Sequence, residues 1–174
     1  MSDSTPRRPF TVADPAEKLG PRAVTLWTVA AALLWVPILI GLVVWAVLLA
    51  TVADRPLWTP LLILAPIALV VAAVHVLVVP RWRYAVHRWE VSDTAVYTRT
   101  GWFDQERRIA PLNRVQTVDT ERGPLERALG LATVTVTTAS SAGAVRIAAL
   151  DLETADRVVA RVTEAAARSR GDAT

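Results

Sequence analysis

Few side chains in this sequence could do chemistry, and their spacing does not assemble a catalytic or metal site. The chain has no cysteine, and its two histidines, His75 and His87, lie twelve residues apart without neighbours at metal-ligand spacing. Ser140 and Ser141 have no base nearby, and no glycine-rich phosphate loop or Gly-x-Ser-x-Gly motif occurs. Acidic pairs are typical of solvated turns rather than of a general acid and base. We therefore expect that the protein is not an enzyme and that it has no catalytic residue, no metal site and no cofactor.

Arginines in the second half offer a different chemistry, because a guanidinium group binds phosphates and carboxylates through a planar fork. Arg107 and Arg108 form a basic pair, and Arg114 and Arg127 follow at longer spacing. The latter two could bind an acidic partner or headgroup, or they could form internal ion pairs. The acids available for internal pairing are Asp119, Glu121 and Glu126. The sequence thus names a candidate surface for an acidic partner or lipid, made of Arg107, Arg108, Arg114 and Arg127.

Two long uncharged stretches occupy the first half of the chain. Ala23 to Ala53 holds 31 residues and Leu61 to Val79 holds 19, with no Asp, Glu, Lys or Arg in either. About 20 apolar residues cross a bilayer core of roughly 30 Å, so both stretches qualify as transmembrane helices. The first is longer than a span needs, and we expect it to tilt, to kink near Pro37 or to lay its first turns in the interface. Residues 23–80 are predicted to form a two-helix transmembrane hairpin.

Basic residues predict the orientation of this hairpin. Only Arg55 lies in the connection between the two stretches, whereas seven basic residues flank their other ends: Arg7, Arg8, Lys18, Arg22, Arg81, Arg83 and Arg88. Positive residues stay on the cytoplasmic side, so both termini are predicted to be cytoplasmic in a multi-pass protein of the cell membrane. Residues 1–22 contain four prolines and mixed charges, and we expect them to be a flexible cytoplasmic tail.

His75 is the only ionisable side chain inside either stretch. An ionisable residue within a membrane could serve a proton relay. His75 also lies five residues before Pro80, within reach of the inner interface, and the stretches contain no charged partner for it. The sequence leaves open whether this histidine is functional.

The remaining 95 residues, from Pro80 to Thr174, are enough for one compact domain. They carry fourteen arginines and twelve acids, a net charge of only +2, so the pI of 10.1 does not indicate nucleic-acid binding. Short alternating runs predict antiparallel strands, and apolar residues at helical spacing from Leu152 predict a closing helix. The predicted strands are Tyr84 to Val91, Ala95 to Thr100, Arg107 to Ala110, Arg114 to Asp119, Thr133 to Thr137 and Ala144 to Ala148. The predicted fold is an α+β domain over residues 81–170, a curved antiparallel sheet or partial barrel capped by a C-terminal helix, attached to the membrane α-helical hairpin.

Three stretches of this domain resemble a known family. They are residues 84–92 with Tyr84 and the Glu-Val-Ser triplet at 90–92, residues 109–118 (IAPLNRVQTV) and residues 123–132 (GPLERALGLA). The chain is identified by these motifs as similar to the bacterial pleckstrin-homology (PH-like) domain family of YdbS-like membrane proteins. This resemblance implies a PH-like fold of roughly seven strands capped by a C-terminal helix, preceded by two spans. It implies little about a ligand.

Two functions are consistent with these features. The first is a membrane-anchored cytoplasmic binding or scaffold module that recruits or organises membrane partners. The alternative is an accessory subunit of a membrane transport or export complex that packs through its hairpin. The expected partners are the lipid bilayer and a membrane protein, a paralogue or a second copy of the chain, and we expect neither nucleic acid nor a small-molecule substrate.

Overall fold

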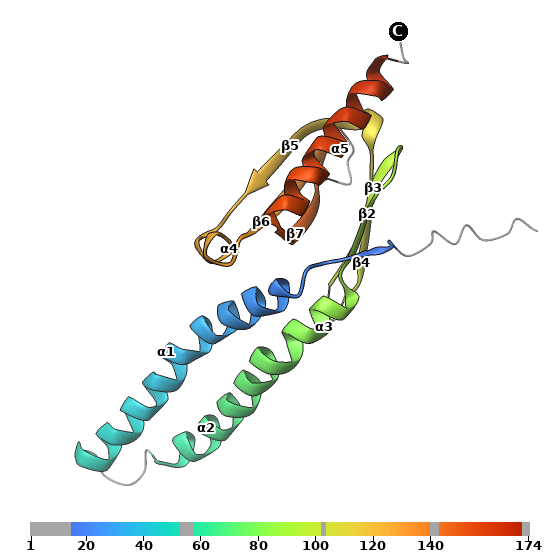
Figure 1. The fold of residues 1–174 in the computed structure, drawn as a ribbon. Coiled ribbons are helices and arrows are strands. Elements are labelled where there is room, and N and C mark those ends of the chain that lie inside the picture. The colour runs from blue at the N-terminus through green and yellow to red at the C-terminus, as the bar shows by residue number, and fades with distance from the viewer. Residues whose placement is uncertain (1–14, 53–57, 102–103, 140–142, 172–174) are drawn as a thin grey trace, which may run out of the picture.

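Two long helices form an antiparallel hairpin in the computed structural model, which describes residues 15–52, 58–101, 104–139 and 143–171 (Figure 1). Helix α1 spans Arg22–Val52 and continues through Pro37. Helix α2 (Trp58–Ala73) continues through the π-turn η2 (Val74–Val78) into α3 (Val79–Val86). The segments Arg22–Thr51 and Trp58–Val86 are long and apolar enough to cross a membrane. Both predicted spans are therefore helical.

The π-turn lies immediately before Pro80, and this position explains it. Proline has no N–H, so the carbonyl four residues earlier loses its usual helical partner. The chain widens here, and the N–H of Val79 bonds the carbonyl of Val74, five residues back. Within this turn His75 faces α1, where Trp35 Nε1 donates a hydrogen bond of 2.9 Å to His75 Nδ1. The intramembrane histidine thus has a neutral partner on the neighbouring helix.

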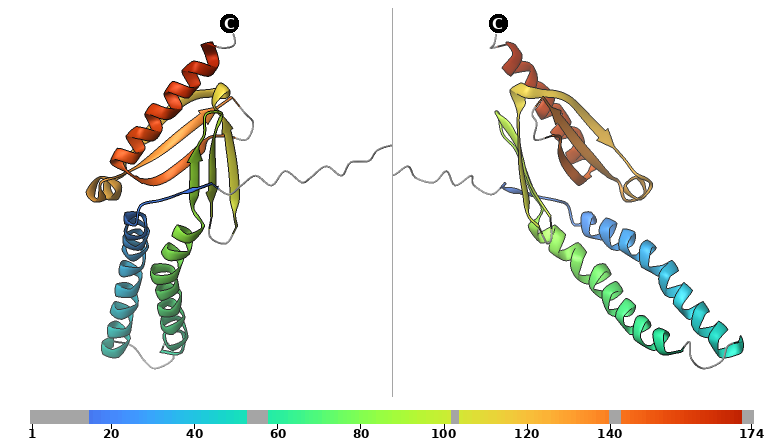
Figure 2. Two further views of the ribbon diagram at one scale, coloured as in Figure 1. Left: turned by 45° about the vertical axis from the view of Figure 1, so that its right-hand side comes forward. Right: turned by 180° about the vertical axis from the view of Figure 1, so that it is seen from behind.

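The domain beyond the hairpin consists of two antiparallel sheets and a covering helix (Figure 2). One sheet has the order β1-β2-β3-β4, with β1 Glu17–Lys18, β2 Arg88–Val91, β3 Ala95–Thr100 and β4 Glu106–Pro111. The turn η3 (Leu112–Arg114) leads to the other, β5-β6-β7, with β5 Val115–Glu121, β6 Leu131–Thr138 and β7 Val145–Asp151. Helix α4 (Pro124–Leu129) joins β5 to β6, and α5 (Leu152–Gly171) follows β7. The predicted architecture of sheet and capping helix is confirmed.

The core lies between the two sheets and α5. Alternation along β6 buries Val134 and Val136 completely, as the sequence predicts, and α5 contributes Ala155 and Val162 at helical spacing. Helix α4 ends at Gly130, which takes the left-handed conformation (φ 68°) that glycine adopts without steric cost. Gly130 therefore ends this short helix where the chain turns into β6.

One predicted strand begins too early. The segment from Tyr84 to Val91 was expected to be extended, but α3 continues to Val86 and β2 starts at Arg88. The last carbonyls of the helix have partners that stabilise this longer course. Arg83 O accepts from His87 N at 2.8 Å, and the Arg88 guanidinium donates to the carbonyls of Tyr84 and His87. The transmembrane helix therefore enters the domain without a break.

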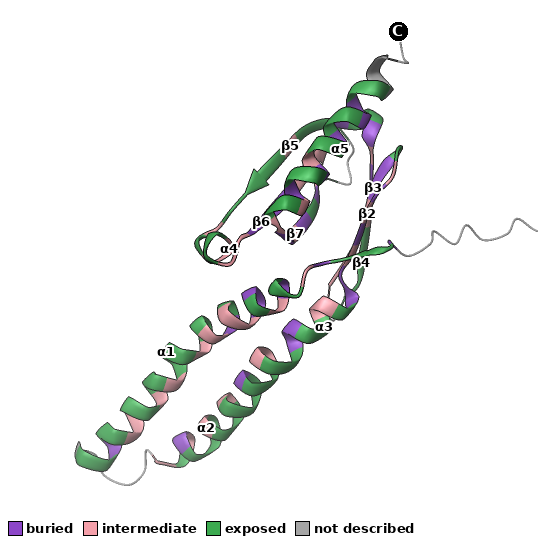
Figure 3. Cartoon of the chain, in the orientation of Figure 1, coloured by how far each residue is buried: buried purple, intermediate pink, exposed green. Residues whose placement is uncertain are grey.

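The segment directly before α1 is not the flexible tail that the sequence predicts. Glu17 and Lys18 pair with Trp89 and Arg88 as the edge strand β1, and Leu19 is only 5% exposed within the core. Ala23, Leu26 and Trp27, in the first turns of α1, belong to the same core. Figure 3 shows buried positions at this end of α1. This packing accounts for the length of the first apolar stretch, since its start lies against the domain. For residues 1–14 the prediction of a flexible tail concerns a part of the chain that lies outside the described residues.

Candidate functional site

The four arginines named from the sequence do not form one surface. Arg107 and Arg108 are consecutive on β4, so their side chains lie on opposite faces of the sheet. Arg108 turns toward the second sheet, where it bonds Ala144 O at 2.9 Å and pairs with Glu106 at 2.7 Å. Arg114 and Arg127 are exposed at opposite ends of β5, whose seven residues span about 23 Å. A single acidic partner surface made of all four is not present.

The acids considered as internal partners are engaged with other groups. Glu121 pairs with Arg146 at 3.3 Å, and Asp119 accepts a hydrogen bond from Thr117. Glu126 accepts from the backbone of Gly123 at 2.8 Å and from the Thr133 hydroxyl at 2.7 Å. These two contacts of Glu126 supply a hydrogen-bond acceptor at the start of α4 and connect this helix to β6. These carboxylates therefore serve local structure.

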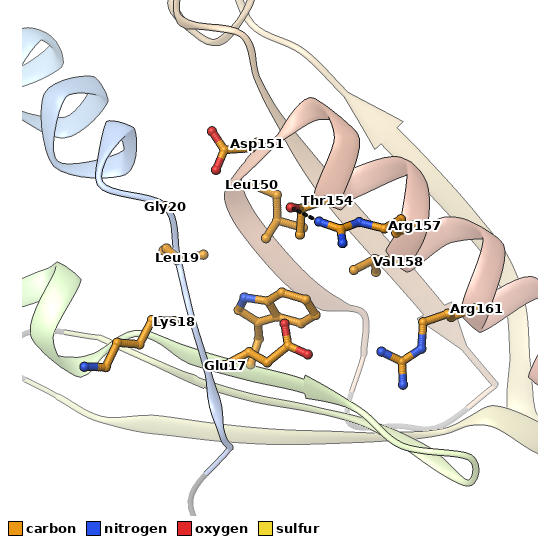
Figure 4. A pocket seen from close by; sticks show the side chains of 11 residues that line it. Glu17, Lys18, Leu19, Gly20, Leu150, Asp151, Thr154, Arg157, Val158 and Arg161 are labelled. Carbon is orange, nitrogen blue, oxygen red and sulfur yellow. Dashed lines mark hydrogen bonds between the residues drawn. The ribbon is translucent and has the colours of Figure 1, made fainter.

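A groove between the segment before α1 and helix α5 is a better candidate site (Figure 4). It encloses about 270 Å³ and is bordered by residues 17–20 on one side and the first turns of α5 on the other. The buried side chains of Trp89 and Leu150 also line it. Gly20 lies against the Asp151 carboxylate, which would have to move aside if this residue carried a Cβ. The site thus exists only where residues 17–20 lie against the domain.

Two arginines supply the positive charge of this groove. Arg157 and Arg161 lie one turn apart on α5, and both extend toward the segment before α1 (Figure 4). Arg157 donates to the Thr154 hydroxyl at 3.1 Å, and Arg161 donates to the carbonyl of Val91 at 2.9 Å. A guanidinium group has five N–H donors, so these contacts orient each fork and leave further donors for an anion.

A buried polar atom also belongs to the lining. Trp89 is 4% exposed, and its indole Nε1 has no hydrogen-bond partner among the described residues. An unsatisfied buried donor costs about 1 to 3 kcal/mol. Glu17 and Asp151 add negative charge at the rim, and Asp151 pairs with Arg22 at 3.6 Å. The groove is therefore suited to a small anionic group with oxygen acceptors rather than to a large apolar ligand.

A cluster of rings and charge fixes the domain on the hairpin. The Arg83 guanidinium lies 4.4 Å from the centre of the Trp27 ring, and the rings of Trp27 and His87 are 5.0 Å apart. His87 Nδ1 donates to the carbonyl of Arg83 at 2.7 Å. Burial lowers the pKa of His87, the nearby Arg83 charge adds to this effect, and the backbone hydrogen bond opposes it. A neutral histidine therefore stands at the joint between the domain and α3.

Sequence reasoning missed the groove because its walls are more than 130 residues apart. Helical periodicity alone places Arg157 and Arg161 on the solvated side of the closing helix, away from its apolar face. The one available signal was Leu19, an apolar residue directly before the first span in an otherwise polar segment.

Comparison with known proteins adds a family and a relative. A family model described as Bacterial PH domain matches residues 18–166, from β1 through both long helices into α5. Over 108 residues the chain is 38% identical to the UPF0699 transmembrane protein YdbS of Bacillus subtilis (strain 168), an alignment that covers 59% of this chain and 67% of that protein. No solved structure matches the chain.

Proposed function

This chain belongs to the bacterial PH domain family, and we propose that it is a membrane-anchored binding module whose groove holds an acidic side chain of a partner protein. The resemblance found in its sequence motifs is confirmed, and it is a membrane protein with a PH-like domain, as its YdbS relative is a transmembrane protein. The proposal assigns recognition and no catalysis to the domain. Its binding groove lies on the cytoplasmic side in the orientation that the basic residues predict.

The observation that supports this proposal is which parts of the chain form the two walls of the groove. One wall is the segment 17–20, which continues directly into α1, and the other is α5. The site is therefore tied to the hairpin at a constant position above the bilayer. Tethering converts binding to another membrane protein into an encounter at high effective concentration, so a few contacts suffice.

The size and charge of the groove favour a carboxylate as its occupant. A volume of about 270 Å³ is below the roughly 300 to 1,000 Å³ of most small-molecule sites, and it suits one or two side chains. Two guanidinium forks one turn apart match the geometry of a carboxylate, which they bind through paired N–H donors. We therefore assign Arg157 and Arg161 to recognition of an Asp or Glu on the partner.

The test compares variants of the full chain after purification from native membranes. Arg157→Gln/Arg161→Gln should reduce the amount of the co-purifying membrane protein, whereas the control Arg168→Gln, an exposed arginine farther along α5, should not. Arg157→Lys/Arg161→Lys keeps the charge but loses the fork, and we expect an intermediate loss. Amide exchange of β6 checks that each variant is folded.

The same experiment separates the proposal from the alternative of an accessory subunit of a transport or export complex. If the partner stays bound to Arg157→Gln/Arg161→Gln at every salt concentration, the groove does not hold it. Binding through the hairpin would instead depend on apolar positions of α1 and α2, such as Leu34 and Leu62. Loss of the partner from variants of these two residues alone would favour the alternative.

A further inference from the structure

A row of four basic side chains crosses the outer face of the first sheet. The register places Lys18 opposite Arg88, Arg88 opposite Arg99 and Arg99 opposite Arg107, one residue from each of β1, β2, β3 and β4. We propose that this basic row, Lys18–Arg88–Arg99–Arg107, binds the phosphates of anionic lipids around the hairpin and so selects the lipids that surround the protein. The inference does not depend on what the groove binds, although Lys18 also belongs to the segment that borders the groove.

The alternation of the strands places the row on the outer face. Residues directly opposite in antiparallel strands share a face, and successive residues of a strand alternate between faces. Trp89 and Thr98 oppose each other and are both buried toward the second sheet. Each is a sequence neighbour of a row member, so the row points the other way. Lys18 and Arg107, at the two edges of the sheet, are exposed.

Four like charges in cross-strand register require compensation. Opposite residues on adjacent strands have Cβ atoms about 5 Å apart, and like charges at that spacing destabilise the sheet. Arg88 gains hydrogen bonds to the carbonyls of Tyr84 and His87, which are neutral groups. Glu90, one step along β2 on the same face, accepts from the backbone of Ala16. Arg99 and Arg107 take part in further interactions, and anionic headgroups would add to this compensation from outside the sheet.

The row lies at the end of the sheet nearest the hairpin. Arg88 is two residues past the end of α3, and Gln105, between β3 and β4, lines a shallow hollow together with Trp82 and Val86 of that helix. Figures 1 and 2 show β2, β3 and β4 rising from the end of α3. The register therefore brings all four basic residues to the level of the junction with the membrane.

Distances along the chain place the row within electrostatic reach of the lipid headgroups. Arg81 is the first charge after the second apolar stretch, and Arg88 follows seven residues later, about 10 Å along a helix axis. The headgroup layer extends about 5 to 7 Å beyond the hydrocarbon core, which leaves the row only a few ångströms above it. This gap is shorter than the screening length of about 8 Å at physiological salt. Exposed Trp82 is the side chain expected at that interface.

Lipid rather than an acidic protein is the occupant that this position favours. Anionic lipids of the cytoplasmic leaflet surround the end of a transmembrane helix, and each nearby basic residue strengthens the attraction to them about fivefold. The charge of the row comes from all four strands, which makes a broad surface without a pocket. Such a surface fits several headgroups better than one side chain.

The test uses the full chain reconstituted in vesicles of phosphatidylcholine with a minor share of phosphatidylglycerol, so that no protein partner is present. The chain is extracted into polymer-bounded nanodiscs, and the lipids that accompany it are quantified. We expect enrichment of phosphatidylglycerol around the native chain and a loss of at least about half of it in Lys18→Gln/Arg107→Gln, the two exposed ends of the row. High salt during reconstitution should also lower it.

A control with the same change in charge decides between the row and net charge. Arg114→Gln/Arg168→Gln removes two exposed arginines at the end of the domain far from the hairpin and should retain the native enrichment. Lys18→Arg/Arg107→Lys should retain it as well. Equal enrichment in the native chain and Lys18→Gln/Arg107→Gln overturns the proposal, and so does an equal loss in both neutralised pairs. If the native ratio persists while the same pair releases a protein in cells, the row binds protein rather than lipid.

Discussion

Replacing Trp27 with alanine tests whether the start of the first helix belongs to the core of the domain. Trp27 is 9% exposed, and its ring contacts Arg83 and His87 while its neighbours Ala23 and Leu26 lie in the core. If the domain were autonomous from residue 81, as the hydrophobic pattern alone suggests, this substitution would affect only the anchor. The structure instead predicts a large loss of stability in strands more than 100 residues away.

The magnitude follows from the size of the cavity and the contacts that disappear. Truncating a buried tryptophan to alanine costs about 3 to 5 kcal/mol, a range that includes the lost packing against neighbouring rings. The contact with the Arg83 cation contributes about 0.5 to 2 kcal/mol of its own where it is desolvated. A domain of this size is stable by about 5 to 15 kcal/mol, so Trp27→Ala removes a large fraction of the total.

Amide hydrogen exchange of the protein in nanodiscs measures this loss of stability within the domain itself. Strand β6 lies at the centre of the second sheet, and its amides are expected to exchange only when the domain opens globally. A loss of 3 to 5 kcal/mol accelerates such exchange by roughly two to three and a half orders of magnitude. Trp82→Ala is the matched control, because Trp82 is 55% exposed on α3, and its effect should stay below about tenfold.

Unchanged exchange in β6 for Trp27→Ala would refute the reasoning. It would mean that the contacts of α1 with the domain carry no free energy and that the domain begins after the hairpin. An equal effect of both tryptophan variants would point to disturbance of the hairpin in general.

Three further outcomes are expected. A reporter active only outside the cytoplasm should work within Asp54 to Pro60 and fail after Thr174, and activity at the C-terminus would reverse the orientation. Burial lowers the pKa of His87, so the unfolded state binds more protons than the folded one as the pH falls through about 6.5. The free energy of unfolding should therefore drop with falling pH until the pH passes the lowered pKa of His87 in the folded state. His87→Gln should flatten this dependence in urea titrations. Val136→Asp places a charge at a fully buried site of β6 and should abolish protected amides in the domain, whereas retained protection would show that the site opens to water at low cost.

Elements with one buried face were predictable from the sequence. Ala95–Thr100 is a strand with the expected limits, and Val134 and Val136 occupy the buried side of β6 because alternation reports a half-buried sheet directly. The closing helix shows the 3.6-residue period for the same reason. Such patterns depend only on which side of an element meets the core.

Features created by continuity between elements were not predictable in this way. Tyr84 and Val86 favour strands by type, but they continue a helix that begins in the second span and ends on satisfied carbonyls. Strand β1 has only two residues, too few to show any period. The pairing of Glu17 and Lys18 with β2 depends on the hairpin, which returns the chain to its starting level.

The arginines show why charge clusters in a sequence are poor guides to charged surfaces in a sheet. Arg107 and Arg108 are adjacent in the chain and therefore point to opposite faces, one into the basic row and the other toward Glu106 and Ala144. Arg157 and Arg161, four residues apart on a helix, do share a face. Period and register decide which charges meet, and register is a property of the fold.

Two residues connect the topology of the hairpin with the proposed lipid surface. Lys18 precedes the first span and Arg88 follows the second, so both belong to the positive charges that predict the orientation and both lie in the basic row. The row can form only if the two ends of the hairpin lie on the same side of the membrane, because one of its four strands precedes the spans and three follow them. The residues that keep this side of the protein in the cytoplasm during insertion would then bind anionic lipid after folding. Moving the N-terminal segment across the membrane should therefore remove β1, open the groove beside α5 and shorten the row together.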